Sequence, residues 1–361
     1  MGRRSPTCWA IAGCYFGLAA LPAAAADGGR AALQAACWAP AALAARMGEN
    51  IPVRRPARAA TRPPKVGDDL ALGLAPEAAR GGGLPAPGVV RSVALPPGRK
   101  LIALTFDLCE TAGETAGYDG AIIDYLRSQG VKATLFAGGQ WMLSHRLRAA
   151  QLLSDPLFEI GTHGWVHRNT RLLAGAELAR EIRAPSAAFA AVRAELGSAQ
   201  CAAGQAAALA AIPERPRLFR FPFGACSAAS LQAVADAGLI AIQWSIATGD
   251  PSPARSAHAI AEAMLRGARP GSIIISHANG RGYHTAAALP MAIPALRARG
   301  FEFVTLSQLL AAGRPIIAET CYDARPGDTD RYDFLFGRRP GTSPALELTS
   351  PHARTAPPLP Q

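Results

Sequence analysis

Two histidines and one carboxylate have the types and spacing of a metal site. His163 and His167 are four residues apart, which places both imidazoles on one side of a helical turn, within reach of one ion. Asp107 directly follows residues 101–106, an apolar run with the composition of a buried parallel strand. Two imidazoles and a carboxylate leave one metal position open to water, as hydrolysis requires. The spacing therefore predicts a hydrolytic metal site.

Polar residues also end other apolar runs further along the chain. Residues 220–224 form Arg-Phe-Pro-Phe-Gly at the end of one run, and Trp244 ends the next, with Asp250 shortly after it. His277 follows a third run. In a parallel barrel the carboxyl ends of the strands meet at one face, where catalytic residues gather. We therefore expect these side chains to lie around Asp107 in one site.

Seven strand-like apolar runs alternate with helical patterns from Arg99 onwards. The runs cover residues 101–106, 131–137, 157–162, 217–221, 239–244, 271–276 and 301–305. Such alternation indicates a parallel sheet, and seven strands favour a closed or nearly closed barrel. A doubly wound open sheet is the alternative, but no Gly-x-Gly-x-x-Gly follows the first run, which argues against a dinucleotide-binding fold. The predicted fold class is α/β, a distorted (β/α)7 barrel that resembles a TIM barrel, after an irregular N-terminal segment.

The helical patterns carry their own start and stop signals. Gly130 follows the pattern at residues 118–129 and is suited to end that helix. Pro185 is expected to divide residues 174–196 into two helices, because proline lacks the N–H that a helix interior needs. Ser307 is expected to cap the last helix of the barrel.

In the order of its motifs the chain resembles the polysaccharide deacetylases, which are carbohydrate esterases with a NodB homology domain. The motifs are Thr-Phe-Asp at 105–107, His-x-x-x-His at 163–167, Arg-x-Pro-x-Gly at 220–224, Trp-Ser at 244–245 with Asp250, and Ile-x-His at 275–277. The resemblance covers about residues 89–313. It implies a distorted (β/α)7 barrel with a divalent metal, usually zinc. It also implies removal of N- or O-acetyl groups from chitin oligomers, peptidoglycan, xylan or exopolysaccharides.

The resemblance implies a catalytic role for each of four matching residues. His163 and His167 correspond to two metal ligands, Asp107 to the general base and His277 to the general acid. Such a set is chemically complete, because an acid must protonate the leaving amine while a base takes the proton of the attacking water.

Four supporting groups follow from the same resemblance. Arg220 corresponds to the arginine that orients the base, and Asp250 to the carboxylate that pairs with that arginine. Phe223 falls where a backbone N–H stabilises the oxyanion. Trp244 corresponds to a wall of the site.

The chain departs from the family pattern at Leu108, where the family has a second Asp as third metal ligand. Leucine cannot bind a metal, so we expect Glu110 in the same loop to supply the missing carboxylate. A rival assignment makes Asp107 the ligand and Glu110 the base. Glu110 could also simply cap the following helix, which would leave Asp119, water or nothing as the third ligand.

Residues 1–26 have the form of an export signal. Arg3 and Arg4 precede an apolar stretch that is too short for a convincing membrane span, and four alanines at 23–26 offer a cleavage site. We expect an exported protein, periplasmic or secreted, with no transmembrane span in the mature chain. Ile-Ala-Gly-Cys14 resembles a lipoprotein box, so anchoring at Cys14 is the second alternative.

Composition then divides the rest of the chain. The expected parts are a signal peptide at 1–26, an Ala/Pro/Arg-rich linker or tail at 27–88, the deacetylase domain at 89–315 and a C-terminal extension at 316–361. Five cysteines follow the signal: Cys37, Cys109, Cys201, Cys226 and Cys321. Their odd number leaves at least one unpaired, and the pairing cannot be deduced. None has Cys-x-x-Cys spacing, so a thiolate metal site is not expected.

The net charge of +11 comes mostly from the N-terminal third, in a Pro/Arg/Ala context. A nucleic-acid groove would mix aromatics with clustered Lys and Arg, so no nucleic-acid partner is expected. The sequence predicts a metal-dependent hydrolase, most simply a zinc enzyme, that removes acetyl groups (N-acetyl by preference) from an envelope or extracellular polysaccharide. The alternatives are a catalytically degenerate glycan-binding barrel, which Leu108 favours, and a hydrolase of non-sugar linear amides.

Overall fold

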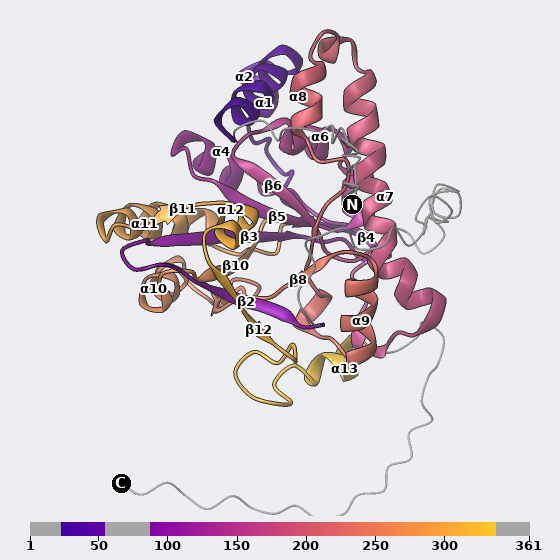
Figure 1. Ribbon diagram of the computed structural model, residues 1–361, viewed down its shortest axis with the longest axis vertical. Coiled ribbons are helices and arrows are strands. Elements are labelled where there is room, and N and C mark those ends of the chain that lie inside the picture. The colour runs from indigo at the N-terminus through magenta and orange to yellow at the C-terminus, as the bar shows by residue number, and fades with distance from the viewer. Residues whose placement is uncertain (1–22, 55–86, 337–361) are drawn as a thin grey trace, which may run out of the picture.

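A curled, mostly parallel sheet with helices on its outside forms the body of the protein (Figure 1). The computed structural model describes residues 23–54 and 87–336. All seven expected strands are present: β3 (Leu101–Leu108), β5 (Ala133–Ala137), β6 (Phe158–Thr162), β7 (Leu218–Phe219), β8 (Ile240–Ile242), β10 (Ile273–His277) and β11 (Glu302–Phe303). The predicted barrel-like α/β fold is confirmed.

The sheet runs in the order β12-β2-β8-β7-β6-β5-β3-β10-β9, with β11 paired to the start of β3. The short β9 (Ile246–Ala247) pairs in parallel with β10 at one end of the strand order. It follows β8 directly in the chain, and β8 is near the other end, so this connection brings the two sides of the sheet close together. Every residue of β3 is buried, as a central strand covered on both faces requires. The register places His277 of β10 directly beside Asp107 of β3.

Helices cover the sheet and begin and end close to the predicted signals. They are α4 (Gly120–Ser128), α5 (Gly139–Ser144), α6 (Arg146–Ser154), α7 (Gly175–Ser198), α8 (Ala206–Ala211), α9 (Ala228–Asp236), α10 (Ala257–Gly267), α11 (Thr285–Ala298) and α12 (Leu306–Ala311). The predicted break at Pro185 is wrong, because α7 is continuous through it. Ile182 and Phe189 on either side are fully buried, and this packing outweighs the hydrogen bond that proline removes.

The cap of the last barrel helix is also different from the prediction. Thr305, and not Ser307, caps α12: its hydroxyl accepts the Gln308 N–H, and the Gln308 side chain accepts the Thr305 N–H at 3.1 Å. The Ser307 hydroxyl instead bonds the carboxylate of Glu159. A capping box binds two backbone donors where a single serine would bind one.

The linker interpretation of residues 27–88 is wrong for residues 27–54, which pack against the barrel. Helix α1 (Ala23–Cys37) buries Leu33 completely in the main core, and the Cys37–Cys201 disulfide joins α1 to the segment after α7. Arg148 of α6 holds the Glu49 carboxylate through two hydrogen bonds of 2.8 and 2.6 Å. The Ala-rich composition concealed this packing because small residues give a weak apolar pattern. Residues 55–86 lie outside the described residues.

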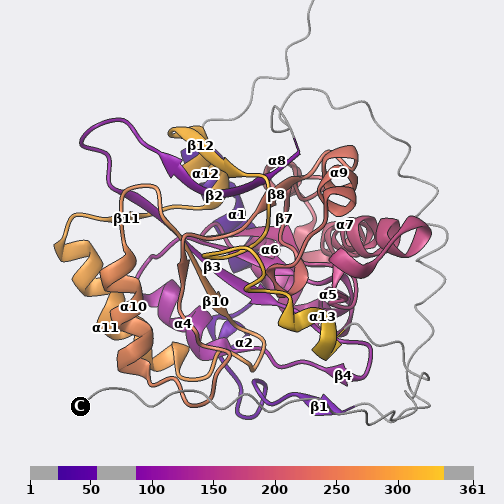
Figure 2. The same ribbon diagram turned by 90° about the horizontal axis from the view of Figure 1, so that it is seen from below.

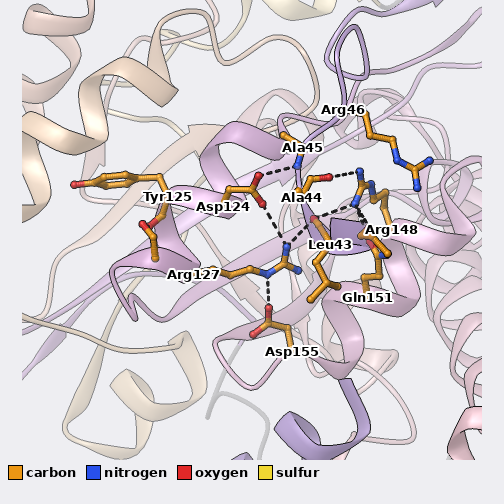
Figure 3. Close-up of polar contacts among 12 residues, drawn as sticks. Leu43, Ala44, Ala45, Arg46, Asp124, Tyr125, Arg127, Arg148, Gln151 and Asp155 are labelled. Atoms are coloured by element: carbon orange, nitrogen blue, oxygen red, sulfur yellow. Dashed lines mark hydrogen bonds and ion pairs between the residues drawn. The ribbon is translucent and has the colours of Figure 1, made fainter. Parts of the chain in front are cut away.

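Arginine side chains of the barrel donate hydrogen bonds to backbone carbonyls in the turn after α2 (Pro40–Leu43), as Figure 3 shows. Arg148 donates to the Leu43 and Ala44 carbonyls at 3.1 and 2.9 Å. Asp124 accepts the Ala45 N–H at 2.7 Å. These contacts satisfy backbone groups that the short helix leaves unpaired, so the turn is part of the folded body. Further along, β1 (Val53–Arg54) pairs with β4 (Glu114–Thr115).

Two strands that were not predicted from the sequence join the sheet at the edge opposite β9. Strand β2 (Val89–Ala94) pairs in parallel with β8, and β12 (Arg314–Ala318) pairs antiparallel with β2. After β12 the chain is bound to the barrel by the Cys226–Cys321 disulfide and leads into α13 (Arg331–Phe336) (Figure 2). Asp333 in α13 accepts hydrogen bonds from Arg171 and Asn169.

The expected signal peptide and the lipoprotein alternative at Cys14 fall on residues 1–22, outside the described residues, apart from Ala23–Ala26, which open α1. Within residues 23–54 and 87–336, no helix has both the length and the apolar character needed to cross a membrane.

The buried contact of α1 yields a stability prediction. Replacing Leu33 by alanine should lower the free energy of unfolding by about 2–5 kcal/mol, because it opens a cavity in the core. Leu147→Ala on α6 is the matched control, since that leucine is 46% exposed, and should change stability by only about 0.5 kcal/mol. Denaturant unfolding measures both. Equal values for the two variants would mean that α1 does not belong to the cooperative unit.

Candidate active site

A cavity of about 560 Å³ opens at the carboxyl ends of the strands. Asp107, His163, His167 and His277 line it, as the sequence predicted for one strand-end face. Trp244, Phe223 and Asp250 line it as well. Part of the wall comes from the C-terminal extension: Asp323, Asp328, Thr329, Arg331 and Tyr332. A volume of this size suits a sugar unit or another small substrate group.

Asp107 forms a buried ion pair with Arg220. Nη1 of Arg220 donates to Oδ1 at 2.8 Å, and both side chains are almost completely buried. The guanidinium also lies over the Phe136 ring, 4.0 Å from its centroid. Burial acts to raise the pKa of Asp107, but the positive charge of Arg220 in direct contact opposes burial, and the pKa is lowered. Asp107 is therefore ionised at neutral pH, as a general base must be.

The geometry of His163 suits a cation. Its Nδ1 lies 2.9 Å from the Arg220 carbonyl, which can only accept, so Nδ1 carries the proton. In the neutral ring Nε2 is then an acceptor, yet it faces Oδ2 of Asp107 at 3.3 Å. Burial lowers the pKa of His163, which disfavours a second proton there. A neutral His163 with its proton on Nδ1 has the lone pair of Nε2 free on the cavity side, which is the form of imidazole that binds a metal, so this ring fits a metal site.

His167 and Phe223 both adopt strained backbone conformations beside the histidine pair. Their φ angles are 57° and 60°, in the left-handed region that non-glycine residues rarely occupy. The His167 ring packs against His163, with centroids 4.9 Å apart, and against Phe223, with centroids 4.3 Å apart. Burial, followed by the neighbouring His163, lowers the pKa of His167 well below its ordinary value. A neutral imidazole held in a strained loop is the form that binds a metal.

His277 is paired with Asp250, which corrects the expected pairing of Asp250 with Arg220. Nδ1 of His277 lies 2.9 Å from Oδ1 of Asp250, and its backbone N–H donates to Oδ2 at 2.7 Å. Thr285 and Thr248 add hydroxyl hydrogen bonds to the same carboxylate, at 2.8 and 3.1 Å. Asp250 thus fixes the ring of His277, whereas Arg220 is taken up by Asp107.

The protonation of His277 follows from this pairing. Burial opposes a charged imidazolium, but the Asp250 carboxylate outweighs burial, so the pKa of His277 is raised. The lowered pKa of Asp107 and the raised pKa of His277 thus occur side by side on adjacent strands. Opposite shifts of this kind are how one site holds both roles at neutral pH.

Glu110 does not join this group, and we withdraw it as the expected third ligand. Its carboxylate accepts hydrogen bonds from Gln140 Nε2 at 3.0 Å, from Ser144 Oγ at 2.6 Å and from the Ala116 N–H at 3.2 Å. It therefore braces α5 and the loop after β3. The helix that follows Glu110 in the chain is α4, whose N-cap residue is Asp119, so Glu110 is not that helix's N-cap either.

Cys109 lies where Glu110 was expected. Its sulfur and one ring nitrogen from each of His163 and His167 all lie within 4.8 Å of one another. Cys109 is the free cysteine of the described residues, and it brings a thiol close to the histidine pair although the sequence predicted no thiolate metal site. The missed signal was strand alternation: Asp107 and Cys109 are two apart and share a face, whereas Leu108 between them is buried in the core.

Comparison with known proteins agrees with this geometry. The family described as polysaccharide deacetylase matches residues 94–242. A chitooligosaccharide deacetylase of Azorhizobium caulinodans is 30% identical over 217 residues, which cover 57% of this chain and 92% of that protein. The chain belongs to the polysaccharide deacetylase family.

Other relatives extend the comparison within the polysaccharide deacetylases. A peptidoglycan-N-acetylglucosamine deacetylase of Listeria monocytogenes is 28% identical over 210 residues, and the chain spans 39% of that longer protein. Among solved structures, a pseudoenzyme of the CE4 family from Bacillus anthracis has a TM-score of 0.51 at 21% identity. The alignment covers 64% of this chain and 72% of that one, and shows the shared fold.

The His277–Asp250 pair gives a direct prediction. In Asp250→Asn the pKa of His277 should fall below its ordinary value, because burial remains while the compensating carboxylate charge is gone. NMR titration of the imidazole measures this. Asp236→Asn, an exposed change on α9, is the control and should leave the titration in place. An unchanged His277 pKa in Asp250→Asn would show that Asp250 does not set the protonation of His277.

Proposed function

We propose that this protein is a metal-dependent hydrolase that removes N-acetyl groups from a polysaccharide of the cell envelope or the extracellular space. The observation that carries the proposal is the pairing of Asp107 with His277 across β3 and β10, beside His163 and His167 in one cavity. The names of the relatives support the substrate class, since they act on peptidoglycan N-acetylglucosamine and on chitooligosaccharides.

His163 and His167 would hold a divalent cation, zinc by preference, with a third donor from the loop after β3. When bound, such an ion polarises a carbonyl and acidifies water. Asp107, held ionised by Arg220, takes the proton of the attacking water.

Two further groups of the chain act on the substrate. The backbone N–H of Phe223, in its strained turn, is proposed to donate to the carbonyl oxygen as negative charge develops there. His277, charged and oriented by Asp250, donates its proton to the departing amine nitrogen. An amide needs this acid because an unprotonated amine is a poor leaving group. Trp244 and Tyr332 offer ring surfaces on the cavity wall where sugars pack.

The disulfides Cys37–Cys201 and Cys226–Cys321 support an exported protein, periplasmic or secreted, because disulfides persist in oxidising compartments. An export signal in residues 1–26 would provide the route.

One observation favours a second candidate, a glycan-binding barrel without turnover. Leu108 is buried in the core at the position where the family pattern has a metal-binding carboxylate. A pure binder, however, would have no use for the buried Asp107–Arg220 pair or for the His277–Asp250 pair.

Acetate release tests the proposal. The full chain, treated with chelator and then supplied with zinc, should release acetate from N-acetylated chitin oligomers or peptidoglycan, and the chelated protein should not. Binding of the oligomers without acetate release in the presence of zinc would support the glycan-binding barrel. Release of acid only from small linear amides would place the activity outside polysaccharides.

The proposed role of His277 as the acid can be tested separately from metal binding. His277→Ala should lower turnover by about 10²-fold or more, since it removes a positioned acid, while the metal content stays unchanged. His258→Ala, on the exposed side of α10, is the matched control and should keep full activity. Elemental analysis accompanies the rates. Loss of metal in His277→Ala would make His277 a ligand and would overturn its assignment as acid.

A further inference from the structure

The loop after β3 offers a sulfur donor to the histidine pair. The sulfur of Cys109 and the ring nitrogens of His163 and His167 fall within a span of 4.8 Å, close enough for one ion to contact all three after small side-chain adjustments. The two histidines come from the loop after β6, and β6 is separated from β3 only by β5. Two nearby strand ends therefore present three donors to one point.

Alternation along β3 explains why the donor is residue 109. Asp107 faces the cavity, Leu108 is fully buried among core side chains, and Cys109 faces the cavity again. A carboxylate at position 108 would lie in the apolar core of this chain. The Glu110 side chain is held by Gln140 and Ser144, away from the histidine pair.

Hydrogen bonds hold the Cys109 sulfur and one histidine of the pair in place. Asn279 donates through Nδ2 to the Cys109 sulfur at 3.1 Å and to the Cys109 carbonyl at 2.9 Å, so the amide fixes both the loop and the sulfur. Amide donors of this kind stabilise metal-bound thiolates. On the histidine side, the Arg220 carbonyl binds Nδ1 of His163 and leaves Nε2 as the ligand atom.

We propose that Cys109 binds the metal as a thiolate together with His163 and His167, which gives this chain a site of one sulfur and two nitrogens. This inference rests on the proposed function and names the third ligand of that site. The donor charge equals that of two histidines and one carboxylate, because a metal-bound thiol is deprotonated. A soft donor, however, favours zinc and cobalt over magnesium and manganese, which prefer oxygen.

Cobalt provides a spectroscopic readout that does not depend on activity. Metal-free full chain with intact disulfides is titrated with Co²⁺, and near-ultraviolet absorption is followed for the charge-transfer band that a cobalt–thiolate bond produces. The wild-type protein should bind one Co²⁺ and develop this band. Zinc should displace the cobalt and remove the band, whereas magnesium should not.

Three variants assign the band to its residue. Cys109→Ser should lose the band and weaken metal binding by at least the roughly 10–100-fold that loss of an outer-shell partner costs. Cys109→Asp should regain binding but not the band, because a carboxylate replaces the sulfur. Glu110→Gln is the comparison for the rival loop residue and should keep both band and affinity.

Each outcome either supports or overturns Cys109 as a metal ligand. One bound Co²⁺ without the band, or unchanged affinity in Cys109→Ser, overturns Cys109 as a ligand, and lost metal binding in Glu110→Gln would return the role to Glu110. Should Cys109→Ser fail to fold, the wild-type band and Cys109→Asp still decide. Acetate release without a band overturns only this inference, whereas a band without acetate release overturns the proposed function and leaves the metal site standing.

Discussion

The ion pair between Asp107 and Arg220 is the constraint on which the rest of the site depends. It joins the end of β3 to the end of β7 across the barrel, and both side chains are almost entirely buried. A lone charge in that position would be costly, so each partner requires the other. The Arg220 carbonyl also fixes the ring of His163, and one residue therefore positions both the proposed base and a proposed metal ligand.

Each of the two proposed proton-transfer groups, Asp107 and His277, has its own partner of opposite charge, and the two partners shift the pKa values in opposite directions. Arg220 lowers the pKa of Asp107 and Asp250 raises the pKa of His277, although Asp107 and His277 are neighbours in register on β3 and β10. The hydroxyls of Thr285 and Thr248 donate to the Asp250 carboxylate and help to hold its orientation. Opposite pKa shifts on adjacent strands suit a site in which one group accepts a proton and the other donates one, as the proposed amide hydrolysis requires.

The sequence predicted the strands and the strand-end residues well for a physical reason. Buried parallel strands are continuous apolar runs, and a charged or polar residue such as Asp107 or His277 ends the run abruptly. The partners were not predictable in the same way. Whether Asp250 bonds Arg220 or His277 depends on side-chain directions at two strand ends, and no spacing in the chain specifies these directions.

Two predictions were wrong because they considered residue types without the side-chain directions and contacts of those residues. Glu110 was expected to be the ligand because it is a carboxylate in the loop that lacks the family's second Asp, but alternation past Leu108 turns the Cys109 sulfur toward the histidines. Residues 27–54 were taken for a linker because alanine-rich segments show little periodicity. Their attachment relies on a disulfide to Cys201 and on Arg148, both more than a hundred residues away from Cys37.

A double-mutant cycle on Asp107 and Arg220 tests the central claim most directly. Unfolding free energies are measured with metal removed for Asp107→Asn, Arg220→Met and the double variant. Arg220→Met alone should cost about 3–5 kcal/mol, since it leaves a buried carboxylate without its partner. The double variant should cost less than the two single costs together, by about 0.5–3 kcal/mol. Additive costs would show that the two residues act independently, and the account of the site built on their pairing would be contradicted.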